Sequence, residues 1–131
     1  MVNVNDGDTI TVNHNGNIAK IRLYGIDSPE LAQNRGYEAR AFTDKLVYRK
    51  NVLIRMMDMD NYGRIVGDVY CDGRDINRLL VLSGFAWAYV YHDDKYTGSE
   101  EFARKKRAGL WADPSPVPPW DFRQSAPGAL R

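Results

Sequence analysis

The chain has 131 residues, the size of one ordinary domain, and can bury a core without a metal or disulfide. Its 18 Lys and Arg residues nearly balance 17 Asp and Glu residues. The resulting net charge of +1 argues against binding nucleic acid mainly through bulk positive charge. A hydrophobic content of 44% is typical of a globular domain. The single cysteine, Cys71, excludes an intramolecular disulfide, and no stretch approaches the roughly 18 apolar residues of a membrane span.

Alternation of polar and apolar residues between turn signals predicts six strands. They are a short first strand around Val2 and Val4, then 8–12, 18–23, 52–57, 64–70 and 86–91. The string His14-Asn15-Gly16-Asn17 predicts a tight hairpin, because Asn-Gly tolerates positive φ. Further turns are expected at 60–63 and 72–73.

Apolar residues at helical spacing predict three helices between these strands. The segments are 36–50, then 75–83 with Asp75 as a possible cap and Gly84 as its end, and 99–108 with Ser99 as a cap. Few connections are long enough for a βαβ crossover. The order of elements therefore favours a small antiparallel barrel with appended helices.

The C-terminal segment differs in composition from the rest of the chain. After Trp111 it holds five prolines, at positions 114, 116, 118, 119 and 127. Proline cannot continue a helix, so this segment is expected to run extended, as a strap packed on the barrel rather than a site for a partner. We therefore divide the chain into a domain at 1–112 and a Pro-rich tail at 113–131.

Four short polar strings could carry chemistry, although each has a simpler structural reading. They are Asp6-Gly7-Asp8-Thr9, the segment 22–30, Asp60-Asn61-Tyr62-Gly63-Arg64 and Tyr89-Val90-Tyr91. Asp-Gly-Asp is usually a turn, and Asp-Ser-Pro-Glu equally fits a helix entry. The two histidines fall in no cluster, which argues against a His-based or zinc site.

Taken together, the strings fit a site for phosphate chemistry better than any of them does alone. Asp8 and Asp27 are hard oxygen ligands at the ends of different strands, as a Ca²⁺ site with few carboxylates needs. Glu30 lies close to Asp27 in sequence, and Arg22 and Arg64 could grip one phosphate with bidentate guanidinium groups. This set suits metal-assisted attack on a phosphodiester.

From Val2 to about Trp111 the chain resembles the staphylococcal nuclease (thermonuclease) family. The strings that carry the resemblance are Asp-Gly-Asp-Thr, Arg-Leu-x-x-x-Asp-Ser-Pro-Glu, Tyr-Gly-Arg and Ala-Tyr-Val-Tyr, in that order. The resemblance implies an α+β, mainly β fold, with a five-stranded OB-type barrel and three helices. This agrees with the barrel expected from the pattern of elements.

The resemblance also implies a calcium site and a group that acts on water. Asp8 and Asp27 would bind Ca²⁺ through their carboxylates, and Ser28 would bind it through its backbone carbonyl. Glu30 would act on the attacking water, either as general base or by orienting it.

The remaining residues implied by the resemblance would bind the substrate. Arg22 and Arg64 would hold the scissile phosphate, while Tyr62, Tyr89 and Tyr91 would line the nucleotide pocket. The expected activity is that of an endonuclease on DNA and RNA. It would prefer single strands and leave 3′-phosphate ends.

Some features depart from the family pattern or leave alternatives open. The loop 31–37 is shorter than in the type member, and Asn61 stands where that protein has a lysine near a nucleotide phosphate. Arg104–Arg107 could be a nucleic-acid patch, although such a run is more often a solvated helix face.

The rival function is a catalytically silent OB-type module that binds nucleic acid or protein. A monomer without membrane contact is expected. The resemblance favours a secreted or periplasmic protein, although the N-terminus lacks the pattern of a signal peptide.

Overall fold

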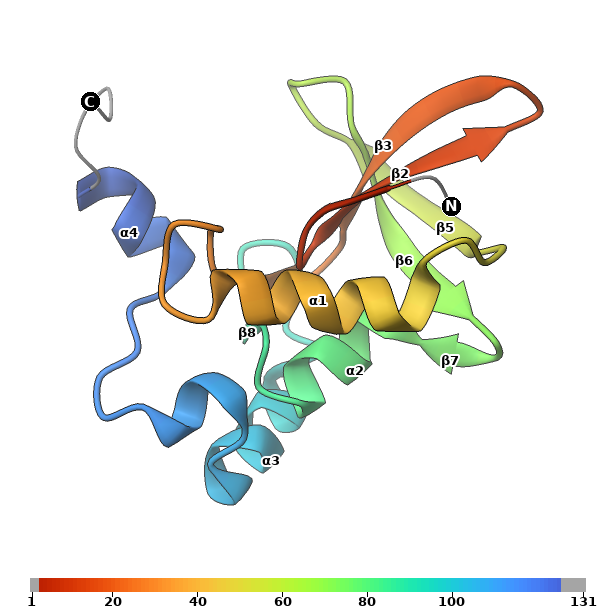
Figure 1. Cartoon of the computed structure of the whole chain (residues 1–131). Helices are drawn as coiled ribbons and strands as arrows, with labels where there is room; N and C mark the ends of the chain where they lie inside the picture. The colour runs from red at the N-terminus through yellow and green to blue at the C-terminus, as the bar shows by residue number, and fades with distance from the viewer. Residues whose placement is uncertain (1–2, 126–131) are drawn as a thin grey trace.

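The structure, a computed structural model, describes residues 3–125 and is built around one mixed sheet (Figure 1). The sheet order is β1-β2-β3-β6-β5, with β7 added to β6. The bounds are β1 Asn3–Asp6, β2 Thr9–His14, β3 Asn17–Leu23, β5 Leu53–Met59, β6 Ile65–Cys71 and β7 Arg74–Asp75. The β2–β3 turn is as predicted, because Asn15 (φ 52°) and Gly16 (φ 88°) both adopt positive φ. A second, two-stranded sheet pairs β4 (Ile26–Asp27) with β8 (Trp87–Ala88).

One pairing in the main sheet departs from the antiparallel arrangement predicted from the sequence. Strands β3 and β6 run parallel, with Ile21 opposite Ile65 and Leu23 opposite Gly67. The chain between them contains β4, a helix and β5, and this segment is long enough for the crossover that a parallel pair requires. Among the described residues no pairing between β1 and β5 closes the sheet into a barrel. The fold is α+β and mainly β, as expected.

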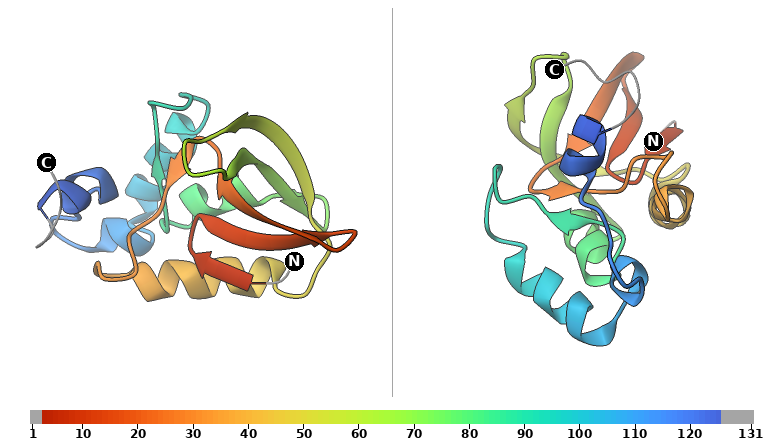
Figure 2. Two further views of the ribbon diagram at one scale, coloured as in Figure 1. Left: turned by 90° about the horizontal axis from the view of Figure 1, so that it is seen from above. Right: turned by 90° about the vertical axis from the view of Figure 1, so that its left-hand side faces the viewer.

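The main helices lie below and beside the strands of the sheet in the right-hand view of Figure 2. Helix α1 (Gly36–Val47) lies against β1, while α2 (Ile76–Leu82) lies against β6 and α3 (Thr97–Lys106). As predicted, Asp75 caps α2, because its side chain accepts a hydrogen bond from the Arg78 N–H. The core between sheet and helices is apolar and includes Ile10, Leu23, Val69 and Leu80. None of the helices in the described part of the chain is long and apolar enough to cross a membrane.

Two of the predicted elements have different bounds in the structure. The strand predicted at 86–91 pairs only at Trp87 and Ala88, because the chain turns after Tyr89, where the His92 N–H donates to the Tyr89 carbonyl. Helix α3 begins at Thr97, so Ser99 is inside the helix and does not cap it. The Ser99 hydroxyl is buried and accepts a hydrogen bond from Arg78 instead.

The Pro-rich tail is not extended throughout, which corrects the sequence-based expectation. After a 3₁₀ turn, η1 (Gly109–Ala112), the chain forms a further helix, α4 (Pro119–Ser125). Proline is compatible with the first helical position because its missing N–H would have no partner there. The N–H groups of Asp121 and Phe122 both donate to the Pro118 carbonyl and so begin the helix. The predicted Val2 strand position and Pro127 lie outside the described residues.

Candidate active site

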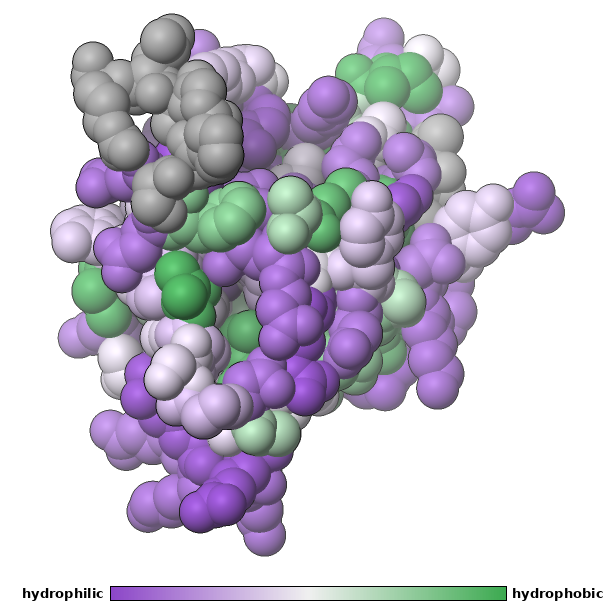
Figure 3. Space-filling model, turned by 60° about the vertical axis from the view of Figure 1, so that its left-hand side comes forward, coloured by the Kyte–Doolittle hydropathy of each residue, from purple (hydrophilic) through white to green (hydrophobic). Residues whose placement is uncertain are grey.

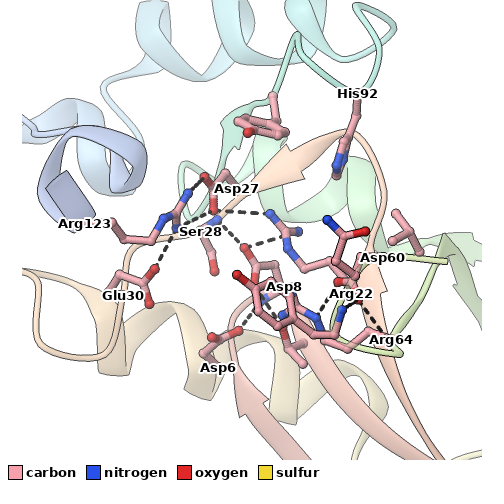
Figure 4. Close-up of a pocket in the computed structure, with 15 residues that line it drawn as sticks. Asp6, Asp8, Arg22, Asp27, Ser28, Glu30, Asp60, Arg64, His92 and Arg123 are labelled. Carbon is pink, nitrogen blue, oxygen red and sulfur yellow. Dashed lines mark hydrogen bonds and ion pairs between the residues drawn. The ribbon is translucent and has the colours of Figure 1, made fainter. Parts of the chain in front are cut away.

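A cavity of about 510 Å³ opens where the ends of several strands meet α4 (Figure 4). Eight of the nine residues that the sequence analysis singled out line this cavity. They are Asp8, Arg22, Asp27, Ser28, Glu30, Tyr62, Arg64 and Tyr89. The ninth, Tyr91, is 78% exposed, and its ring lies 5.3 Å from that of Tyr89. The fold therefore brings together polar strings that are far apart in the sequence.

The register between β2 and β3 places Asp8 beside Arg22. Thr9 in β2 is opposite Arg22 in β3, and the Leu23 N–H donates to the Asp8 carbonyl over 2.8 Å. Gly25 (φ 78°) then turns the chain into β4, where Asp27 lies. A side chain at position 25 would also collide with the ring of Tyr96. This turn brings the second carboxylate back to the same arginine.

Arg22 is buried, with only 9% of its surface exposed, and it bridges the two carboxylates. Its Nη1 lies 3.4 Å from Asp8 Oδ2 and donates to the Leu23 carbonyl over 2.7 Å. Its Nη2 donates to Asp27 Oδ1 over 3.3 Å. Asp8 also accepts a 2.7 Å hydrogen bond from the Ser28 N–H. One guanidinium thus orients both predicted metal ligands.

The pKa values of the cavity's carboxyl groups are shifted in different directions. Burial raises the pKa of Asp27 to about 6, although the hydrogen bond from Arg123 acts in the opposite direction. Burial, together with the negative charge of Asp8, raises the pKa of Asp6 to about 8. The pKa of Asp8 is lowered in spite of burial, because Arg22 and the Ser28 N–H stabilise its charged form. The cavity therefore holds carboxyl groups that differ in how readily they lose a proton.

Glu30 lies at the rim of the cavity on a short loop between β4 and α1. The loop is closed by a reciprocal pair of 2.9 Å hydrogen bonds, from the Gln33 N–H to the Glu30 carbonyl and from the Glu30 N–H to Gln33 Oε1. Gly36, the first residue of α1, lies so close to the Glu30 carbonyl that a Cβ there would collide with it. The backbone of Glu30 is therefore fixed, while its side chain remains 32% exposed.

Arg64 reaches the cavity from the β5–β6 turn, where Asp60 organises the backbone. Asp60 Oδ1 accepts from the N–H groups of Tyr62 and Arg64, both over 2.9 Å, and Oδ2 accepts from Arg64 Nε over 2.6 Å. Burial alone would raise the pKa of Asp60, but these hydrogen bonds lower it below its usual range. The Arg64 guanidinium lies 5.5 Å from the centre of the Tyr62 ring, which is itself 85% exposed.

Seven residues of the cavity lining were not predicted as site residues, namely Asp6, Thr9, Asp60, Asn61, Val66, His92 and Arg123. Asp6 belongs to the same Asp-Gly-Asp string as Asp8, so the sequence contained a signal for it. His92 follows the Tyr89 string, and its Nδ1 accepts from the Gly25 N–H over 3.1 Å. The sequence contained no signal for Arg123, which comes from α4 and donates to Asp27 and Glu30.

Comparisons with known proteins agree with the family that the sequence resembles. The profile of the family described as "Staphylococcal nuclease homologue" matches residues 20–113. The chain is 36% identical over 142 residues to a micrococcal nuclease of Shigella flexneri, covering 98% of this chain and 82% of that protein. It is 40% identical over 126 residues to an uncharacterized endonuclease of Escherichia coli, covering 94% and 82%. It is also 40% identical over 111 residues to the staphylococcal-like nuclease CAN1 of Arabidopsis thaliana, covering 83% of this chain and 34% of that protein.

Proposed function

The chain belongs to the staphylococcal nuclease family and is a nuclease, and from this premise we propose that it is a Ca²⁺-dependent endonuclease acting on DNA and RNA. One observation carries the proposal. Two buried carboxylates share the Arg22 guanidinium in a cavity that also contains Glu30 and Arg64. A module that only bound nucleic acid would have no use for all five of these groups at once.

The donor set of the cavity fits calcium. Asp8 and Asp27 are buried carboxylates, and a hard cation with several remaining water ligands accepts such a sparse oxygen set. These two side chains and the Ser28 carbonyl would hold the ion. Within residues 3–125 no cluster of three or more His, Cys, Asp or Glu side chains could hold a metal, so Asp8 and Asp27 would have to supply the carboxylate ligands by themselves. When bound, calcium supplies positive charge that stabilises the transition state.

The other side chains have roles that follow from their chemistry and position. Glu30 acts on the attacking water, since it is the carboxylate at the rim that a metal at Asp8 and Asp27 would leave available. Arg22 and Arg64 reach the cavity from different elements and bind the scissile phosphate, with planar donors that match the charge of the transition state. Water forms the new bond to phosphorus as the bond to the 5′-oxygen breaks, so the product keeps a 3′-phosphate.

The tyrosines suit an unpaired base better than a duplex. Tyr62 is largely exposed at the rim, and the ring of Tyr89 lies in the lining with Tyr91 beside it. Aromatic rings stack on bases of any sequence, and an unstacked base is available mainly in single strands. A preference for single-stranded substrates over duplexes follows from this arrangement.

The test is to incubate the purified protein with denatured DNA and with RNA, in millimolar Ca²⁺ and then in excess chelator, and to map the ends produced. Calcium-dependent cuts that end in 3′-phosphate are expected on both substrates. Cuts that persist in chelator would contradict the metal requirement. A folded protein that binds single strands without cutting them would instead be the silent binding module.

A further inference from the structure

The tail helix α4 places a positive charge directly on the candidate metal site. Arg123 Nη2 donates to Asp27 Oδ2 over 2.7 Å, and Nη1 donates to Glu30 Oε1 over 2.6 Å (Figure 4). Nη1 also lies 3.4 Å from Asp27 Oδ1. A single guanidinium thus bridges the proposed metal ligand and the residue proposed to act on water.

Packing, as well as charge, holds α4 in this position. Trp120 lies three residues before Arg123, and its ring is 5.7 Å from the rings of Trp87 and Tyr89. Trp87 is the residue paired with Asp27 between β4 and β8. The helix is therefore anchored on the strand next to the one that carries the metal ligand.

The segment before α4 is fastened to the loop that carries Glu30. Gln33 Nε2 donates to the Val117 carbonyl over 2.8 Å. Arg35 binds Asp113 with two hydrogen bonds, of 2.8 and 3.1 Å. These contacts are polar, and in the face shown in Figure 3 small apolar patches lie among hydrophilic residues. The tail and the Glu30 loop together form one rim of the cavity.

Guanidinium groups donate to both carboxylate oxygens of Asp27. Arg22 donates to Oδ1, and Arg123 donates to Oδ1 and Oδ2. A cation that takes Asp27 as a ligand must displace one of these partners. Arg22 is 9% exposed and also bonded to the Leu23 carbonyl, whereas the Arg123 side chain is 45% exposed. Releasing Arg123 to water therefore costs less than releasing Arg22.

We propose that Arg123 is a built-in counter-ion that Ca²⁺ must displace from Asp27, so that α4 blocks this metal ligand when calcium is absent. The proposal rests on the calcium site of the proposed function. It makes calcium affinity depend on a residue that is not itself a metal ligand. Without calcium, the Arg123 pair neutralises carboxylates that would otherwise repel each other. With calcium, the metal takes over that role.

The experiment is a calorimetric titration of Ca²⁺ into the full chain and two variants, R123Q and R104Q. Removing the competing charge is expected to tighten calcium binding about 10-fold, which corresponds to about 1.4 kcal/mol. Arg104 is the matched control, because it is also a helix arginine paired with a glutamate, Glu100, but does not line the cavity. R104Q should bind calcium like the unmodified protein.

A second measurement follows thermal unfolding of the same proteins in chelator and in calcium. R123Q should be less stable than the unmodified protein in chelator, and it should gain more from calcium, because its carboxylates lack their counter-ion until the metal binds. Calcium affinity in R123Q that is equal to or weaker than that of the unmodified protein would overturn the displacement proposal alone. If neither protein bound calcium, the proposed metal site itself would be wrong.

Discussion

At the scale of single residues, Glu30 differs from the other carboxylates of the cavity in its exposure. Asp8 and Asp27 are buried and share Arg22, while the side chain of Glu30 is 32% exposed and contacts neither of them in any hydrogen bond within residues 3–125. Burial and a shared cation suit a metal ligand, whereas a rim position suits a group that handles water. The two kinds of carboxylate are therefore separable by mutation.

E30Q should lower turnover by two or more orders of magnitude while leaving calcium affinity nearly unchanged. The amide keeps the shape of the side chain but can neither accept a proton from water nor carry the charge that holds it. Turnover on denatured DNA and a calcium titration of the same sample provide the comparison. A larger loss in calcium affinity than in turnover would assign Glu30 to the metal instead.

His92 should contribute less to stability in mild acid than at neutral pH. Burial and, secondarily, the positive charge of Arg22 lower the pKa of His92 below its usual 6.5, and Nδ1 accepts from the Gly25 N–H. Below pH 6.5 the unfolded chain therefore binds a proton at this position that the folded chain resists, so the contribution of His92 to stability falls as the pH drops, while the raised pKa values of Asp6 and Asp27 act in the opposite direction. In H92N the amide oxygen can replace the Nδ1 acceptor without titrating, so lowering the pH from 6.5 to 5 should favour the folded state more than it does in the unmodified protein.

Thermal unfolding midpoints at several pH values, measured in chelator, test this effect. His14 provides the control, because it lies exposed at the β2–β3 turn and its removal as H14N also deletes one imidazole. A pH dependence in H92N equal to that of the unmodified protein would assign the pH sensitivity to other groups. The stacking of His92 on Tyr24, with ring centres 5.3 Å apart, predicts some loss of stability at every pH.

At the scale of elements, the start of α1 determines where the backbone of Glu30 lies. A Cβ at Gly36 would collide with the Glu30 carbonyl and the Leu31 Cα, both of which are backbone atoms that cannot rotate away. G36A should therefore displace Glu30 and lower turnover by about 10²-fold, as misplacements of about 1 Å do. It should also lower stability by about 1–3 kcal/mol.

Gly98 provides a matched glycine in another helix. It lies exposed near the start of α3, and nothing stands within 4 Å of the position its Cβ would take. G98A should raise stability by up to about 1 kcal/mol, because alanine loses less entropy in a helix, and turnover should not change. If G36A and G98A had equal turnover, the start of α1 would not determine the position of Glu30.

Elements defined by local signals could be predicted from the sequence, and those defined by distant packing could not. Asn15-Gly16 and the Asp75 cap act within a few residues, so their turn and helix were expected. Helix α4 begins at Pro119 and is held by Trp120 against Trp87. Prolines signal an extended chain, and no local pattern could indicate a partner 33 residues away.

The same distinction applies to the site. Asp8, Arg22, Asp27 and Glu30 were recognised as short strings, because the strands and turns that hold them lie close in the sequence. Arg123 reaches Glu30 across 93 positions, at the end of a segment predicted to be extended. Its place in the cavity depends on the docking of α4, which only the folded structure reveals.

At the scale of the whole molecule, positive and negative charges nearly balance. The affinity for substrate must therefore come from contacts in the cavity rather than from the electrostatic field of the whole protein. The chain carries 18 basic and 17 acidic residues, and much of its surface charge is paired. Each phosphate neutralised on a single strand contributes about −0.7 to the slope of log K against log salt. With Arg22 and Arg64 as the phosphate ligands, the slope should be no steeper than about −2.

Salt dependence of single-strand binding by E30Q in calcium measures this slope without cleavage. Adding R64Q should make the slope shallower by about 0.7, because one phosphate contact is lost. Adding K105Q in the exposed run Arg104–Arg107 should leave it unchanged if that run is a solvated helix face. If the slope were −4 or steeper and K105Q made it shallower, the end of α3 would instead contact the nucleic acid. The cavity would then account for the cleavage chemistry but not for the binding affinity.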